Sequence, residues 1–211
     1  MAYEQLKGQV PIPEVYGWAE DGGQGFLYMS LIEGDTLEER WTDMSEEERQ
    51  AVCNDIRPLV QAWRGLKQDK DASYIGSVGK RRLKDISIGD RPTKQGPFLG
   101  VDAVEQFHTA GSIEIRNDIP IVFTHADLVA PNSLLTKGPN PTVAAIIDWG
   151  QPGWYPEYWE FCKARRVGWI SKYRDNATLE EWRSRYMPMF LDRVDDETIY
   201  HPWLYFHLSN M

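Results

Sequence analysis

Two groups of polar residues, each directly after an apolar stretch, constrain the fold of this chain more than any other feature. Residues 119–124 read IPIVFT and lead into HADLVAPN at 125–132, and residues 143–147 read VAAII and lead into DWG. Short apolar runs bounded by turn residues predict buried strands. Because a sheet is a rigid support, the polar side chains that follow such strands are expected to face a cleft.

The rest of the sequence predicts an α+β domain that is mainly helical, with short β-hairpins. Ser45 followed by three glutamates predicts the capped start of a long helix. Two hairpins are expected, at residues 10–32 and 132–147. Two further helical regions are expected at residues 101–109 and 159–211. Glycine, proline and charged residues without periodicity predict a long surface loop at 73–97.

Length and charge narrow the class of partner. The 211 residues fit one ordinary globular domain, and the formal net charge of -9 argues against a nucleic-acid binder, because phosphate backbones select for clustered lysine and arginine. A small-molecule substrate, cationic or hydroxylated, is the expected partner. The basic run at residues 80–82, next to Asp85, is interpreted as part of a solvated loop.

Cysteine use and hydropathy predict a cytoplasmic protein that does not interact with membranes. Cys53 and Cys162 have no metal-binding or redox spacing, so a reducing compartment is the default. No apolar run reaches the length of a bilayer span, and residues 1–10 lack the features of a signal peptide.

The two polar groups resemble motifs of the aminoglycoside phosphotransferases and their choline-kinase-like relatives, which are distantly related to protein kinases. Residues 125–132 resemble the catalytic loop H-x-D-x-x-x-x-N, and residues 146–149 the metal-binding I-D-W/F segment. Residues 10–18 are similar to the IPVP-x-V-x-G segment of fungal-type members. The similarity extends to about residue 163, whereas the remainder matches only in its helical, aromatic character.

The resemblance implies a fold and a division of the chain. The fold is the large C-terminal lobe of a protein-kinase-like enzyme. Residues 1–34 are then a remnant of the N-lobe and the linker between lobes, and residues 35–211 are the C-lobe. The implied activity is phosphoryl transfer from ATP to a hydroxyl group of a small molecule, with Mg²⁺ and ATP as cofactors.

Chemical roles follow for four residues. Phosphoryl transfer needs a carboxylate to orient the acceptor hydroxyl and take its proton, and Mg²⁺ on the nucleotide phosphates needs hard oxygen ligands. The resemblance assigns catalytic roles to two residues of the loop. Asp127 is the base, and His125 stabilises the loop through a hydrogen bond. The same resemblance assigns metal and nucleotide binding to Asn132 and Asp148. Taken alone, each residue is better interpreted as one that caps a turn or stabilises a loop, and only the set at fixed spacing favours catalysis.

Several features of the family are missing from this sequence. Family members carry a glycine-rich loop over the phosphates, a strand lysine that holds them and a helix glutamate that pairs with this lysine, and only nine residues precede Val10 here. The catalytic loop has Ala126, Val129 and Pro131 where relatives commonly have H-G-D-L-H-x-x-N. Gly150 replaces an acid. Ordinary ATP-dependent turnover is therefore expected to be severely impaired.

Two other functions stay open, as a repurposed or an inactive member of the family. A pseudokinase-like enzyme could use Asp127 with His125 for nucleotide-free isomerisation or cyclisation of a small metabolite, without a cofactor. A non-catalytic binding protein could instead cover the face left by the missing lobe with a second copy, as a homodimer. Nucleotide binding that depends on Asn132 and Asp148 would distinguish the phosphotransferase hypothesis from these two alternatives.

Overall fold

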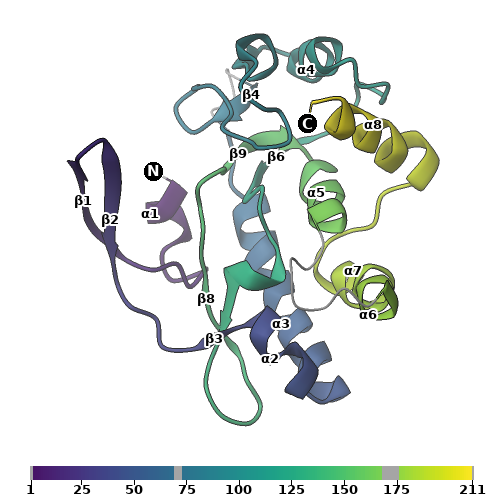
Figure 1. Cartoon of the computed structure of the whole chain (residues 1–211). Coiled ribbons are helices and arrows are strands. Elements are labelled where there is room, and N and C mark those ends of the chain that lie inside the picture. The colour runs from purple at the N-terminus through teal and green to yellow at the C-terminus, as the bar shows by residue number, and fades with distance from the viewer. Residues whose placement is uncertain (1, 69–72, 168–175, 211) are drawn as a thin grey trace.

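The computed structural model describes residues 2–68, 73–167 and 176–210 and shows small antiparallel sheets surrounded by helices (Figure 1). The strands are β1 (Val15–Asp21), β2 (Gln24–Met29), β3 (Asp35–Thr36), β4 (Tyr74–Ser77), β5 (Phe98–Leu99), β6 (Ile121–Thr124), β7 (Ser133–Leu135), β8 (Val143–Ile146) and β9 (Gly153–Pro156). The α-helices are α1 (Ala2–Leu6), α2 (Leu37–Arg40), α3 (Glu46–Arg64), α4 (Ala103–Gly111), α5 (Trp159–Val167), α6 (Asn176–Glu181), α7 (Met187–Phe190) and α8 (His201–Ser209). Short 3-10 or π turns are η1 (Trp41–Asp43), η2 (Pro92–Lys94), η3 (Ala130–Asn132), η4 (Trp182–Tyr186) and η5 (Asp196–Tyr200). The predicted α+β class is confirmed.

Strand pairing brings distant loops together. Among the described residues the sheets have the orders β1–β2, β3–β7–β8 and β5–β4–β9–β6. In the last of these, Ser77 at the end of β4 and Thr124 at the end of β6 both pair with Gly153 at the start of β9. The loops that leave β4 and β6 and the segment that enters β9 therefore lie at one end of this sheet.

Helix α3 forms as local sequence predicts. The Ser45 hydroxyl accepts a hydrogen bond from the Glu48 backbone N–H, and the Glu48 carboxylate accepts one from the Ser45 N–H, which is a complete capping box. Its apolar face is buried at helical spacing through Val52, Ile56, Val60 and Trp63. This face packs against α7 and contributes to the first of two hydrophobic clusters among the described residues.

The prediction of a surface loop at residues 73–97 is wrong over much of that range. Its first residues form β4, which pairs with both β5 and β9. Further along, Leu83, Asp85 and Ile88 are buried, the two apolar ones in the second hydrophobic cluster. No periodic pattern marks this segment, because these side chains enter the core one at a time between turns.

The other predicted elements are present, with shifted ends. Strands β1 and β2 form the first hairpin and β7 and β8 the second, while α4 begins two residues later than expected. The region from residue 159 onward is mainly helical where it is described, with a non-helical segment at residues 191–195, and residues 168–175 of that prediction lie outside the described residues. Within those ranges, no helix is long and apolar enough to cross a membrane.

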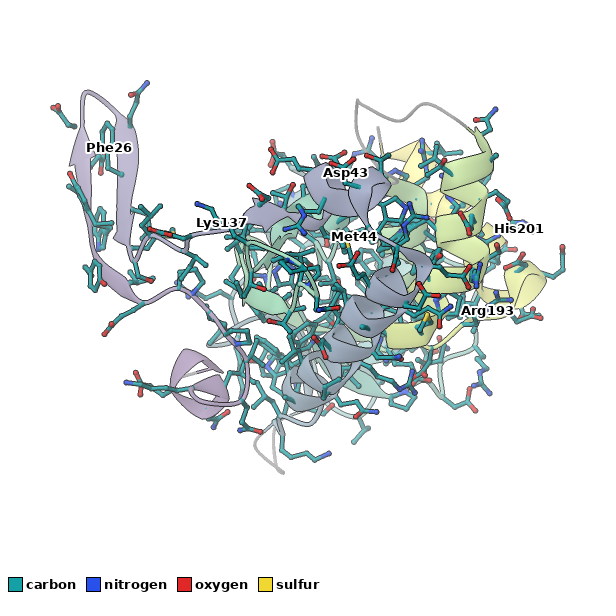
Figure 2. The ribbon with its side chains drawn as sticks, turned by 90° about the horizontal axis from the view of Figure 1, so that it is seen from below. Phe26, Asp43, Met44, Lys137, Arg193 and His201 are labelled. Carbon is teal, nitrogen blue, oxygen red and sulfur yellow. The ribbon has the colours of Figure 1, made fainter. Side chains whose placement is uncertain are left out.

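The hairpin of β1 and β2 stands away from the rest of the molecule (Figures 1 and 2). Every side chain of β2 is exposed, and so are most of those of β1. Trp18 is 74% exposed, and large apolar side chains surround it on both strands, with Phe26 visible near the tip in Figure 2. Exposed apolar area of this extent on one element is typical of a contact surface.

Candidate active site

His125 fixes the first part of the 125–132 loop. It is fully buried, and its ring lies 4.4 Å from that of Trp149 and 6.2 Å from that of Trp63, between centroids. Its Nδ1 accepts a hydrogen bond from the Asp127 backbone N–H at 3.2 Å, and its Nε2 then donates to the Ile147 carbonyl at 3.0 Å. Burial lowers the pKa of His125 to about 4, so the ring is neutral at physiological pH.

Asn132 joins Asp127 to the strand that precedes Asp148. Its Nδ2 donates to the Asp127 carbonyl at 2.8 Å and to the Asp127 carboxylate at 3.3 Å. The backbone carbonyl of Asn132 accepts a hydrogen bond from the Ile147 N–H at 2.9 Å, while the Ile147 carbonyl accepts one from His125 Nε2. The backbone next to Asp148 is therefore held by both ends of the 125–132 loop.

A buried carboxylate supports the same loop from below. Glu160, at the start of α5, is 1% exposed and accepts backbone hydrogen bonds from His125 at 2.8 Å and from Ala126 and Leu128 at 3.3 Å. Burial raises the pKa of Glu160, and the charge of Arg64 and the backbone donors oppose this rise. Because three amides converge on one side chain, the loop conformation depends on Glu160.

Two residues of the site have a left-handed backbone, with φ +65° at Ala126 and +61° at Asp148. An aspartate tolerates this region because its short side chain hydrogen-bonds locally, whereas an alanine costs about 1–2 kcal/mol there. The surrounding hydrogen bonds of Glu160 and His125 hold Ala126 in place. Strained backbone of this kind is often found at functional sites.

Burial and nearby charged groups shift the pKa of Asp127. Burial raises the pKa of Asp127; the charge of Lys163 lowers it, and those of Asp148 and Asp85 raise it further. A carboxyl group with a raised pKa is a stronger base than an exposed aspartate. The structure therefore brings all four predicted residues together: Asp127 and Asp148 interact electrostatically, and Asn132 and His125 contact the same backbone.

A buried ion pair lies next to this group. Lys163 and Asp85 are 3.1 Å apart, with side-chain exposures of 1% and 0%. Asp85 also accepts from the Trp159 indole N–H at 2.9 Å, and Lys163 donates to the Gln151 amide oxygen at 2.7 Å. The network thus connects α5 and the chain after β4 with the segment that follows Asp148.

Sequence reasoning missed Glu160, Lys163 and Asp85 as parts of the site. The sequence places Asp85 beside a basic run interpreted as a solvated loop, but the Asp85 side chain is 0% exposed. One signal was available, because Glu160 and Lys163 are one helical turn apart within a strongly apolar, aromatic segment. Where charged side chains are buried among apolar ones, they are paired.

The donors present fit a Mg²⁺ ion that is shared with phosphate oxygens. Since Asn132 uses Nδ2 for Asp127, its Oδ1 remains as an oxygen donor, and the Asp148 carboxylate is exposed. No group of three His, Cys, Asp or Glu side chains arranged for a metal occurs in the described parts of the chain. Mg²⁺ usually takes one or two protein oxygens together with substrate phosphates, so a complete protein cage is not required.

Comparison with known proteins decides the family. The family model described as "Phosphotransferase enzyme family" matches residues 2–196. The chain belongs to this phosphotransferase family. The match covers both polar groups and most of the helical region that follows them.

Solved structures show the same fold. The chain is similar to aminoglycoside phosphotransferase APH(3'')-Id from Streptomyces rimosus ATCC10970, with a TM-score of 0.53, 17% identity, and coverage of 99% of this chain and 77% of that one. It is also similar to the aminoglycoside-3'-phosphotransferase of type VIII, with a TM-score of 0.57, 15% identity, and coverage of 98% and 77%. No curated protein matches the sequence. The kinase-like phosphotransferase fold predicted from the motifs is confirmed.

The neutral His125 leads to a pH prediction for stability. Its pKa is about 4 in the folded chain and near 6.5 when unfolded, so the unfolded chain binds more protons between these values. Stability is therefore fully present above pH 6.5 and is lost as pH falls towards 4, by on the order of 3 kcal/mol. Urea unfolding at pH 7.5, 6.0 and 5.0 measures this slope. In His125→Gln the slope between pH 7.5 and 5.0 should be clearly smaller, and equal slopes would contradict the prediction.

Proposed function

We propose that this protein transfers a phosphoryl group from Mg-ATP to a hydroxyl group of a small molecule. The observation that supports this most is the hydrogen-bonded connection from Asp127 through Asn132 and Ile147 to Asp148. It joins a half-buried carboxylate of raised pKa to an exposed carboxylate and an available amide oxygen. Phosphoryl transfer needs these two functions next to each other.

The residues of the chain would divide the work as follows. Asp127 orients the acceptor hydroxyl and accepts its proton, and its raised pKa makes it an effective base. Asn132 holds the Asp127 carboxylate through Nδ2, and its Oδ1 would hold the metal together with the Asp148 carboxylate. When bound, Mg²⁺ neutralises the charge on the nucleotide phosphates. His125 and Glu160 hold the loop in the conformation that this requires.

Calorimetric titration with Mg-ATP tests the proposal directly. We expect micromolar affinity in the wild type and a loss of about 100-fold or more in Asp148→Ala, because the metal loses a charged ligand. EDTA should abolish the heat in the same way. Asp118→Ala removes an exposed aspartate that pairs with Arg116 at the surface, and it is expected to leave the affinity unchanged.

Absence of heat in both proteins would contradict the phosphotransferase proposal for this chain as it stands. The nucleotide-free alternative would then be favoured, since the buried Asp127–His125 loop does not itself require a nucleotide. That reaction would persist in Asp148→Ala and without ATP. Activity assays on small metabolites in nucleotide-free buffer would distinguish it from a purely binding role.

The exposed hairpin supports a second proposal, that two copies associate through β1 and β2. Trp18 and Leu27, which pair across the hairpin, are 74% and 56% exposed. In sedimentation velocity we expect a dimer that dissociates in the double variant Trp18→Ser/Leu27→Ser. Since both side chains are already exposed, the free energy of unfolding per chain should change by less than about 0.5 kcal/mol. A wild-type monomer at all concentrations would contradict this proposal.

A further inference from the structure

The largest cavity described is basic, although the chain as a whole is acidic. It has a volume of about 940 Å³, and the segment after β4 forms most of its wall. Four basic side chains line it, Lys80, Arg81, Arg82 and Lys84, against two acidic ones, Asp85 and Asp90. The net charge of the whole chain is -9, so this concentration of positive charge is local.

Most of the positive charge of this cavity is not neutralised by the protein. Asp85 is paired with Lys163, which leaves Asp90 as the acid facing the basic group. Within the described ranges, the head groups of Arg82 and Lys84 make no hydrogen bond or ion pair, and both residues are exposed. Arg81 donates from Nε to the Val78 carbonyl at 3.1 Å, which holds the turn.

The cavity adjoins the candidate catalytic loop. Ser77, Thr124 and Gly153 share one end of the β4–β9–β6 sheet, so the chain after β4 and the chain after β6 leave the sheet at the same end, with β9 between them. Gln151, which lies between Asp148 and β9, is itself part of the cavity wall. Asp85 at the cavity also acts electrostatically on Asp127.

The proposed metal ligands and the basic cavity belong to different sheets. The proposed metal ligands come from the β7–β8 hairpin, with Asn132 directly before β7 and Asp148 shortly after β8. The basic cavity belongs instead to the β4–β9 side of the other sheet. In phosphoryl transfer the nucleotide and the acceptor approach the transferred group from opposite directions. We therefore expect the acceptor on the side of the basic cavity.

We propose that this cavity binds the acceptor through an anionic group, a phosphate or a carboxylate, held by Lys80, Arg82 and Lys84. The assignment as acceptor rests on the proposed phosphotransferase function. It gives the substrate a charge opposite to the cationic one suggested by the overall composition. Arginine and lysine bind phosphate and carboxylate oxygens through charge-assisted hydrogen bonds.

Glycerol 3-phosphate, which carries both hydroxyls and a phosphate, is the probe for the test, with uncharged glycerol as its comparison. In calorimetry without nucleotide or Mg²⁺, we expect heat with glycerol 3-phosphate and none with glycerol. The variant Arg82→Gln/Lys84→Gln should bind at least about 10-fold more weakly. Affinity should fall with added salt in the wild type and less steeply in this variant.

The matched control is Arg116→Gln/Lys137→Gln, which removes the same charge from exposed side chains of the surface. It should bind the probe like the wild type, and equal unfolding temperatures should show that both double variants fold. Unchanged affinity in Arg82→Gln/Lys84→Gln would overturn the proposal. So would an aminoglycoside that binds more tightly than glycerol 3-phosphate in the wild type and in this variant.

Two further outcomes separate the sources of phosphate and the two proposals. If Mg-ATP displaces the probe and loses affinity in Arg82→Gln/Lys84→Gln, the cavity holds the nucleotide, and the acceptor assignment is overturned. Probe binding without Mg-ATP binding would remove the proposed function and leave the anion site standing. Mg-ATP binding without probe binding would remove the anion site alone.

Discussion

Replacing Lys163 with methionine is expected to lower the free energy of unfolding by about 3–5 kcal/mol, because a buried carboxylate then loses its counter-charge. Asp85 is 0% exposed, and the Lys163 ammonium lies 3.1 Å from it. The Asp85 carboxylate also accepts hydrogen bonds from the indole N–H of Trp159 and the Ser87 backbone N–H. Two neutral donors cannot replace an ammonium group. Urea denaturation at neutral pH measures the loss.

A double-mutant cycle separates the ion pair from packing. In Asp85→Asn/Lys163→Met neither charge remains, so we expect a much smaller loss of stability than the sum of the single variants. Arg116→Met is the matched control, because its ion pair with Asp118 is exposed at both ends, and it should cost less than about 0.5 kcal/mol. Strictly additive losses in the cycle would contradict a coupled pair.

The sequence predicted those parts of the fold that depend on neighbouring residues. The start of α3 depends on Ser45 and Glu48, which are one turn apart, and the second hairpin depends on two short apolar runs joined by a turn. The motif of His125, Asp127 and Asn132 is also local, because all three lie within eight consecutive residues. Patterns of this kind are legible without tertiary information.

The supporting contacts depend on residues that are far apart in the chain and could not be predicted in the same way. Asp85 is buried only because Lys163 and Trp159 of α5 reach it, and nothing around residue 85 indicates this. Glu160 accepts its hydrogen bonds from a loop more than thirty residues earlier. The basic cavity arises in the same way, since β4 places the segment after it beside Gln151. The charge of the ligand that this cavity can bind therefore depends on strand pairing, which cannot be predicted from composition.

Asp127→Asn is expected to reduce the rate of phosphoryl transfer by about 10²–10⁴-fold, the usual contribution of a general base. Asparagine keeps the size of the side chain and can still contact Asn132, so binding of Mg-ATP in calorimetry should stay within about 2-fold of the wild type. The rate is measured as ADP formation with glycerol 3-phosphate as the acceptor.

The pH profile gives this prediction a second readout. Because burial raises the pKa of Asp127, the basic form appears only at a pH above the usual aspartate range. The wild-type rate should therefore rise with pH through that raised pKa, and the residual rate of Asp127→Asn should be flat over the same interval. An unchanged rate in Asp127→Asn, or the same rise with pH in both proteins, would show that another group takes the proton. Loss of the rise together with loss of rate is the combination that a merely structural aspartate would not produce.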